Sequence, residues 1–266
     1  MHHSLKTWLT AGALCVAAGS AHAQYSDGTI KLGVMNDQSG TYADLSGQGS
    51  VWAAKKAIED FCKTTKCHDK IEVVFADHQN KPDIGSNVVR QWFDVDKVDA
   101  VVDVPTSSVA LAVNTITKEK NKVFLVSGAA ASNLTGKDCS PNTVHWTYDT
   151  WALANGTGKA IVKTGGDSWF FLTADYAFGH ALEADTAAVV EKNGGKVVGK
   201  VRHPFPAQDF SSFLLQAQAS KAKIVALANV ATPSTRSSRR RNSASSAAGR
   251  SSPACWSISA TSMRSA

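Results

Sequence analysis

Between residues 29 and 127 the chain alternates between short apolar runs and longer segments whose apolar residues recur every three or four positions. The first pattern is typical of a buried β-strand and the second of an amphipathic helix. Four strands are predicted, at Thr29–Met35, Lys70–Asp77, Asp99–Val104 and Lys122–Ser127. Helices are predicted within 42–62, Ile84–Asp94 and Ser108–Lys120. Because the strands are apolar on both faces, this order predicts a parallel sheet covered by helices on both sides.

The segment 132–150 interrupts the alternation, and the same pattern then resumes. Further helices are predicted at Trp151–Lys163, Phe178–Gly194 and Phe210–Lys221, with strands at Ser168–Asp175, Lys196–His203 and Lys223–Val230. Two such blocks predict an α/β fold of two doubly wound parallel-sheet lobes, the second incomplete. Residues 24–131 are assigned to lobe one, 132–150 to a crossing segment and 151–230 to a partial lobe two.

The pattern stops at Val230, and residues 231–266 contain six arginines but no Lys, Asp or Glu. Ser, Arg, Ala and Pro dominate when GC-rich coding DNA is translated out of frame. Codons for this tail, shifted by one nucleotide, can encode an amphipathic helix, a glycine stop and a β-branched strand. We therefore favour a frameshift after Val230, which makes 231–266 an out-of-frame tail. A natural disordered tail and a basic interaction tail are the alternatives.

This tail also explains the formal net charge of +6. It supplies six of the 28 Lys and Arg residues, so residues 1–230 hold 22 basic and 22 acidic residues. The basic character therefore does not indicate a nucleic-acid-binding surface on the folded part.

The N-terminus has the pattern of an export signal. A positive start at Lys6 is followed by an apolar stretch, Trp8–Gly19, that is too short to span a bilayer. Ala21–Ala23 then provides a small-x-small cleavage site. Leu14 before Cys15 does not fit a lipoprotein signal. We expect residues 1–23 to be a signal peptide and the mature protein to be soluble in the periplasm; a buried N-terminal helix is the alternative.

Export makes disulfides possible, and Cys62 and Cys67 lie close enough in sequence for a local bridge or for two free thiols. Ligand pairs with metal-site spacing are absent from the sequence, so no metal or cofactor is predicted. The dinucleotide and phosphate-binding glycine motifs, the G-x-S-x-G elbow and the H-E-x-x-H pair are absent as well. The sequence therefore predicts a binding protein rather than an enzyme.

Ligands of open parallel sheets bind beyond the carboxyl ends of the strands. The loops selected by this rule are Asn36–Asp44, Pro105–Ser108, Ser127–Ser132, Ala174–Phe178 and Arg202–Asp209. The candidate ligand-binding residues in them are Tyr42, Ser107, Ser108, Gly128, Ala129, Ala130, Asp175, Tyr176 and Arg202.

Each candidate also has an ordinary structural interpretation. Ser107 and Ser108 open a helix, where a carboxylate is well placed, but serine is also a common helix cap. The small residues 128–130 either let a ligand approach backbone amides or form a tight turn.

The larger candidates face the same choice. Tyr42 and Tyr176 stack on a ligand or are exposed loop tyrosines. Asp175 holds an ammonium group or caps a helix. Arg202 clamps a carboxylate or forms a surface ion pair. Trp146 is expected to pack at the junction of the lobes.

Several segments resemble exported substrate-binding proteins of ABC importers, of the branched-chain amino-acid (Leu/Ile/Val) binding type. These are "IKLGVMNDQSGTYAD", "FADHQNKPDIG", "PNTVHWTYDT", "YAFGHALEADTAAVV" and "QDFSSFLLQAQASKAK". The resemblance covers about Thr29 to Val230. The last four of these segments are similar to a subgroup of the family that is linked to amino acids, amides and aromatic carboxylates.

The resemblance implies a type 1 periplasmic binding fold whose lobes close on a small carboxylate, held in the loops that match 105–108 and 127–132. It also implies a membrane permease as partner. A sensory receptor module of the same fold and a non-functional truncated remnant are the alternatives that the sequence leaves open.

Overall fold

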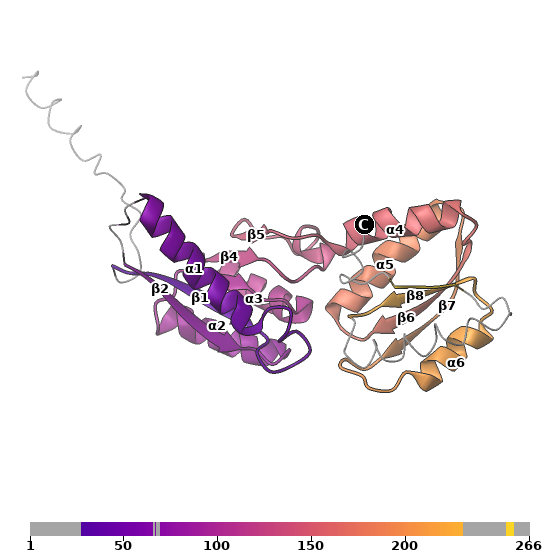
Figure 1. Ribbon diagram of the computed structural model, residues 1–266, viewed down its shortest axis with the longest axis horizontal. Coiled ribbons are helices and arrows are strands. Elements are labelled where there is room, and N and C mark those ends of the chain that lie inside the picture. Colours follow the sequence, from indigo (N-terminus) through magenta and orange to yellow (C-terminus); the bar gives the residue numbers. More distant parts are fainter. Residues whose placement is uncertain (1–27, 66, 68–69, 231–253, 258–266) are drawn as a thin grey trace, which may run out of the picture.

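The computed structural model describes residues 28–65, 67, 70–230 and 254–257, which form two α/β lobes side by side (Figure 1). The predicted signal peptide, and most of the predicted out-of-frame tail, lie outside the described residues. Each lobe is built on one parallel sheet, and the chain passes from the first to the second between β5 and α4. The predicted fold class, two doubly wound parallel-sheet lobes, is therefore confirmed.

Lobe one contains a five-stranded parallel sheet in the order β2-β1-β3-β4-β5. Its strands are β1 (Ile30–Asn36), β2 (Ile71–Asp77), β3 (Ala100–Asp103), β4 (Val123–Val126) and β5 (Thr143–His145). Its helices are α1 (Gly47–Thr65), α2 (Pro82–Asp94) and α3 (Ser107–Glu119). The order reverses direction between β1 and β3, so the carboxyl ends of these two strands form the crevice where such sheets bind ligands.

The core of lobe one lies between the sheet and the pair α2 and α3. Met35, Val101 and Phe124 project from the strands into this core and are fully buried. Trp92 of α2 packs so closely over Gly33 that a β-carbon there would lie 2.4 Å from its ring. A side chain at position 33 would therefore displace α2 from the sheet.

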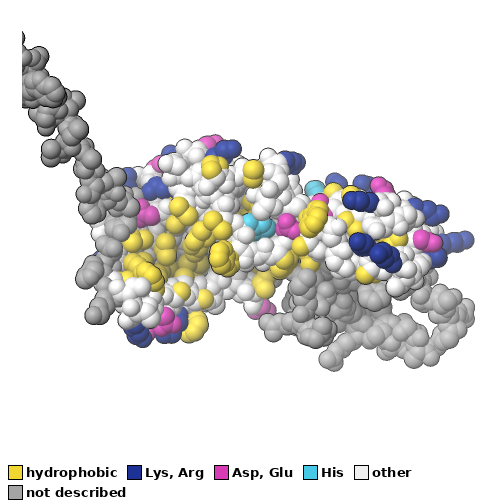
Figure 2. Space-filling view, turned by 90° about the horizontal axis from the view of Figure 1, so that it is seen from above, with side chains coloured by type: hydrophobic (Ala, Val, Ile, Leu, Met, Phe, Trp, Pro, Cys, Tyr) yellow, Lys and Arg dark blue, Asp and Glu magenta, His cyan; other side chains and the backbone are white. Residues whose placement is uncertain are grey.

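The opposite face of this sheet is only partly covered, which differs from the sequence prediction. Helix α1 contacts β1 and β2. Beyond it, Val123, Leu125 and Val144 are exposed. Hydrophobic side chains accordingly gather on lobe one in the view of Figure 2.

Two features of the crossing segment 132–150 correct the sequence analysis. The segment was predicted to be irregular, yet Thr143–His145 forms β5 and pairs with β4. Trp146 was expected to pack at the junction of the lobes, but its side chain is 80% exposed. The backbone N–H of Trp146 donates to the carbonyl of Val126, so the chain remains an edge strand here and turns this side chain outward.

Lobe two contains a second parallel sheet in the order β7-β6-β8-β9. Its elements are α4 (Thr150–Lys163), β6 (Ser168–Ala174), α5 (Ala177–Lys192), β7 (Lys196–His203), α6 (Ser211–Ala219), β8 (Ile224–Ala228) and β9 (Ala254–Ser257). Trp169 and Phe171 of β6 pack under α4 and α5, whereas Phe170 faces α6. Strand β6 is buried along its whole length, as its apolar sequence predicts.

Strand β9 pairs in parallel with β8. The sequence predicted no strand in this part of the tail.

A disulfide joins Cys62 and Cys67, which settles the alternative left open for this pair, and Cys139 is a free, exposed thiol. Among the described helices, none combines the length and the apolar character that crossing a membrane requires.

Candidate functional site

The carboxyl ends of the two sheets face each other, and their loops meet between the lobes. Lobe one contributes the loop after β1 and the start of α3. Lobe two contributes the loop after β6, with Tyr176 and Ala177, and the loop after β7, with Phe205. Both sets of loops are those that the strand-end rule selects.

An aromatic cluster joins the lobes at this point. The hydroxyl oxygens of Tyr42 and Tyr176 lie 2.6 Å apart, and both side chains are buried. The ring of Phe205 stacks on that of Tyr176, with centroids 4.2 Å apart and planes inclined by 9°. It also lies 6.1 Å from the ring of Tyr42. The candidates Tyr42 and Tyr176 are therefore brought into direct contact.

Phe205 was not among the candidates. The prolines on either side of it, Pro204 and Pro206, mark its segment as a loop, which gave it no strand or helix pattern. The available signal was a large apolar residue inside a loop that follows a strand.

Burial keeps the phenols protonated. It raises the pKa of Tyr42 and of Tyr176 above the ordinary value of 10, and it does the same for nearby Tyr148. Two hydroxyls that share one hydrogen bond use one of their two protons. The second proton can be donated to an acceptor that enters between the lobes, such as a carboxylate oxygen.

A buried carboxylate positions Tyr42. Asp37 is fully buried and accepts the backbone N–H groups of Gly40 and Tyr42, each at 2.8 Å. The side-chain amide of Asn80 donates to the same carboxylate at 2.6 Å, and the hydroxyl of Thr106 donates to the amide oxygen of Asn80. These bonds tie the loops after β1 and β2 to the start of α3.

Ser107 connects two of the predicted loops. Its side chain is buried, and its hydroxyl oxygen accepts the backbone N–H groups of Ala130 and Ala131, each at 3.2 Å. Ligand contact and a purely structural role were both open for this hydroxyl and for the small residues 128–130. In the structure the hydroxyl binds the amide of Ala130, together with that of Ala131, so Ser107 shapes the loop after β4.

The side chains of Ser108 and Ala130, both in lobe one, contact lobe two. The hydroxyl oxygen of Ser108 accepts the backbone N–H of Ala177, at the start of α5, at 3.2 Å. The methyl group of Ala130 belongs to the hydrophobic cluster of lobe two, together with Leu153 and Tyr176.

The two other small candidates lie within lobe one. Gly128 packs against Pro105, since a β-carbon at Gly128 would lie 2.8 Å from the α-carbon of Pro105. Ala129 is fully buried, and its carbonyl lies 2.7 Å from Nε2 of His145.

Asp175 and Arg202 lie at the exposed edge of lobe two rather than in the aromatic cluster. Their side chains are 53% and 48% exposed, and Nη1 of Arg202 lies 4.0 Å from Oδ1 of Asp175. That carboxylate oxygen also lies 2.7 Å from Nε2 of His180. The two candidates contact each other at the surface, and the pair is loose enough for Arg202 to change partner.

The turn that directs α3 toward lobe two is strained. Asp103 and Val104 have φ angles of 80° and 58°, in the left-handed region that a β-branched residue rarely adopts. Such residues cost about 1–3 kcal/mol each and tend to lie at functional sites. Asn36 and Ser127 bind the Asp103 carboxylate, whose pKa is raised by burial.

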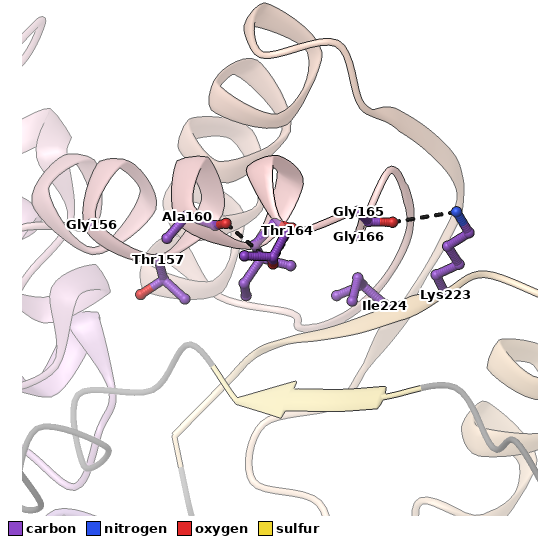
Figure 3. A pocket seen from close by; sticks show the side chains of 9 residues that line it. Gly156, Thr157, Ala160, Thr164, Gly165, Gly166, Lys223 and Ile224 are labelled. Carbon is purple, nitrogen blue, oxygen red and sulfur yellow. Dashed lines mark hydrogen bonds between the residues drawn. The ribbon is translucent and has the colours of Figure 1, made fainter.

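A cavity of about 580 Å³ lies elsewhere, between the C-terminal half of α4 and the start of β8 (Figure 3). Its lining includes Ala160, Thr164 and Ile224, at the amino ends of the strands of lobe two. It is therefore on the edge of the sheet opposite to the aromatic cluster. In the part of the chain that the structure describes, no group of three or more His, Cys, Asp or Glu side chains could hold a metal ion.

Comparison with known proteins gives one consistent result. Residues 29–241 match the family model described as periplasmic binding protein. A periplasmic binding protein structure from Burkholderia mallei is 49% identical with a TM-score of 0.76, over 82% of this chain and 59% of that chain. A branched-chain amino acid ABC transporter periplasmic ligand-binding protein from Burkholderia xenovorans LB400 is 32% identical with a TM-score of 0.67, over 86% and 60%.

A curated relative is the Leu/Ile/Val-binding protein homolog 6 of Brucella abortus (strain 2308), which is 27% identical over 215 residues. The match covers 79% of this chain and 53% of the relative, so the chain spans about half of that protein's length. The matched proteins are named as binding proteins, not as enzymes.

Proposed function

Because the chain belongs to the periplasmic binding protein family, we propose that it is the exported solute-binding component of an ABC importer. It captures a small carboxylate, namely an amino acid, an amide derivative or an aromatic acid, between its lobes. The observation that carries this proposal is the contact of Tyr42 and Ser108 in lobe one with Tyr176 and Ala177 in lobe two. These residues lie at the carboxyl ends of both sheets, where ligands of such folds bind.

The start of α3 is the anchor for the ligand's carboxylate. Backbone N–H groups at a helix N-terminus, together with the helix dipole, favour an anion. The hydroxyl of Ser108 lies there, beside the amide of Ala177, and Tyr42 and Tyr176 supply a phenolic proton between the lobes. Arg202 remains a second candidate for a carboxylate contact, since its present partner lies 4.0 Å away.

The aromatic cluster contacts the body of the ligand. Tyr42, Tyr176 and Phe205 offer flat apolar surfaces with neutral hydroxyls. An aliphatic or aromatic side chain gains hydrophobic contact there without burying a charge. One relative is named a Leu/Ile/Val-binding protein homolog and another a branched chain amino acid ABC transporter periplasmic ligand-binding protein, and both names support a ligand of this kind.

Transport follows from closure of the lobes. A ligand that contacts both lobes stabilises the closed arrangement relative to the open one, and only this difference in affinity shifts the equilibrium. The permease of the importer then recognises the closed form. The name of the Burkholderia xenovorans relative, an ABC transporter ligand-binding protein, supports this partner.

The proposal is tested by thermal denaturation of the 266-residue chain with L-leucine, L-isoleucine, L-valine and benzoate. L-leucinol, which lacks the carboxylate, is the matched control. We expect at least one acid to raise the melting temperature saturably and to be recovered unchanged, with a dissociation constant of about 1 mM. Weak binding is expected because the chain spans only 53–60% of the three relatives described above, and a ligand of those proteins has their full length to contact. If no acid has an effect, if leucinol equals leucine, or if an acid is converted chemically, the proposal is wrong.

A further inference from the structure

Thr150 forms the joint between the lobes. It is the first residue of α4 and is fully buried. Its backbone N–H donates to the carbonyl of Ala130 at 2.8 Å. Its hydroxyl accepts the backbone N–H of Ser132 at 3.0 Å and donates to Oδ2 of Asp185 at 2.6 Å. One hydroxyl thus joins a loop of lobe one to a helix of lobe two.

Helix capping does not account for these bonds. The cap of α4 is Asp149, whose carboxylate accepts the backbone N–H of Ala152 at 2.8 Å. A threonine in the first turn of a helix commonly bonds to its own backbone. The Thr150 hydroxyl instead bonds to Ser132 and Asp185, which lie 18 and 35 positions away in sequence.

The groups that Thr150 joins belong to the candidate binding site. The loop 130–132 donates the backbone N–H groups of Ala130 and Ala131 to Ser107 at the start of α3, and Ala130 packs in the same hydrophobic cluster as Tyr176. Helix α5, which carries Asp185, begins at Ala177 and is bonded there to Ser108. The start of α3 and the loop after β4 are thus both connected to α5.

We propose that Thr150 and Asp185 are positioning residues that hold the loop 130–132 in register with α5. The role rests on the proposed function, because the loop matters for binding only if it lies at the ligand site. A change in the loop on ligand binding is then transmitted to α5, and through α5 to the lobe that closes. The Thr150 hydroxyl is the link, since it is the shared partner of Ser132 and Asp185.

Amide hydrogen exchange at Ser132, measured by NMR on the ligand-free 266-residue chain, tests the position of the loop directly. We expect Thr150→Val, which keeps the shape but removes the hydroxyl, to accelerate exchange at Ser132 by about tenfold or more. Thr150→Ser should restore the protection. The matched control is Thr164→Val at the C-terminal cap of the same helix, because the Thr164 hydroxyl bonds locally to Ile161. It should leave Ser132 unchanged.

Variants of Asp185 provide a second test of the same inference, and Asp185 is less buried than Thr150. Asp185→Ala should also accelerate exchange at Ser132, whereas Asp185→Asn retains an acceptor and should remain close to the unmodified chain. If Thr150→Val does not fold, the Asp185 variants decide whether the pair positions the loop. Unchanged protection of Ser132 in the folded variants would overturn the inference.

Adding L-leucine separates this inference from the proposed function. If leucine binds the unmodified chain, we expect it to alter exchange at Ser132 and at Ala177 together, and Thr150→Val to uncouple the two amides. Changes that stay together in Thr150→Val would also overturn the inference. If neither leucine nor the other acids bind, the proposed function fails, while the ligand-free exchange still decides whether Thr150 positions the loop.

Discussion

The hydroxyl of Tyr42 in lobe one lies 2.6 Å from the hydroxyl of Tyr176 in lobe two, so a single hydrogen bond between buried phenols joins the lobes. Residues 134 positions apart in sequence meet here. The same two hydroxyls are those that a ligand would contact. The bond is therefore both part of the contact between the lobes and part of the proposed binding surface.

Removing either phenolic oxygen should loosen this contact. We expect Tyr42→Phe and Tyr176→Phe each to lower the free energy of unfolding by about 1 kcal/mol, the usual net value of such a bond. The double variant should lose about as much as one single variant, because both substitutions remove the same bond. Urea denaturation of the unmodified chain, the two single variants and the double variant measures these free energies of unfolding. Strict additivity of the single losses would show that the bond does not contribute.

Adjacent serines at the start of α3 should behave differently. Ser107→Ala leaves two buried amides, those of Ala130 and Ala131, without their acceptor, and should lower the free energy of unfolding by about 1–3 kcal/mol. Ser108→Ala removes one half-buried bond to Ala177 and should cost less, about 0.5–1.5 kcal/mol.

Solution scattering distinguishes the two serines further. We expect Ser108→Ala, whose bond crosses between the lobes, to increase the radius of gyration more than Ser107→Ala, whose bonds lie within lobe one. The opposite order would contradict the assignment of Ser108 to the contact between the lobes.

The periodic patterns predicted the long helices and strands, because burial determines both the apolar pattern in the sequence and the place of the element in the fold. Strand β6, for example, is buried at every residue and reads as a continuous apolar run. Strand β5 was missed because three residues at a half-exposed edge carry too short a pattern. Phe205 was missed because its contact with Tyr176 depends on how two distant loops meet, which no local pattern contains.

The site was predicted only to the level of its loops. The strand-end rule selected the loops around Tyr42, Ser108 and Tyr176, which meet between the lobes, because the rule depends on topology alone. It could not predict that Ser107 binds the amides of Ala130 and Ala131. It also could not distinguish Arg202, which lies at the surface, from residues that lie between the lobes.

Arg202 should contribute little to stability. Exposed ion pairs are worth about 0–1 kcal/mol, and its distance to Asp175 is 4.0 Å. We expect Arg202→Gln to change the free energy of unfolding by less than about 0.5 kcal/mol. If Arg202 clamps a carboxylate, the variant should lose affinity for L-leucine but not for L-leucinol, as measured by thermal shift. An equal effect on both compounds would exclude the clamp.

The composition of residues 231–266 leads to a prediction about the coding DNA. These residues contain six arginines and no acid, so we expect resequencing across codons 228 to 234 to reveal one inserted or missing nucleotide. Restoring the frame should replace the tail by a helical pattern followed by a β-branched strand. An unchanged DNA sequence would contradict the frameshift and favour a natural tail.

Acid should destabilise the fold through His78. Its side chain is fully buried, and burial lowers its pKa from 6.5 to about 4, although Asp37 and Asp77 oppose the shift. The unfolded chain therefore binds a proton at a pH where the folded chain does not, so stability falls as the pH drops from about 6.5 to about 4. The loss of unfolding free energy attributable to His78 over this window is about 3 kcal/mol.

The variant His78→Asn tests this contribution. Its amide oxygen can still accept the backbone N–H of Asn80, but this part of the acid dependence should disappear. Urea unfolding of both proteins across the window measures the difference, which cancels the contributions of other groups. Parallel pH profiles would show that His78 does not titrate on unfolding.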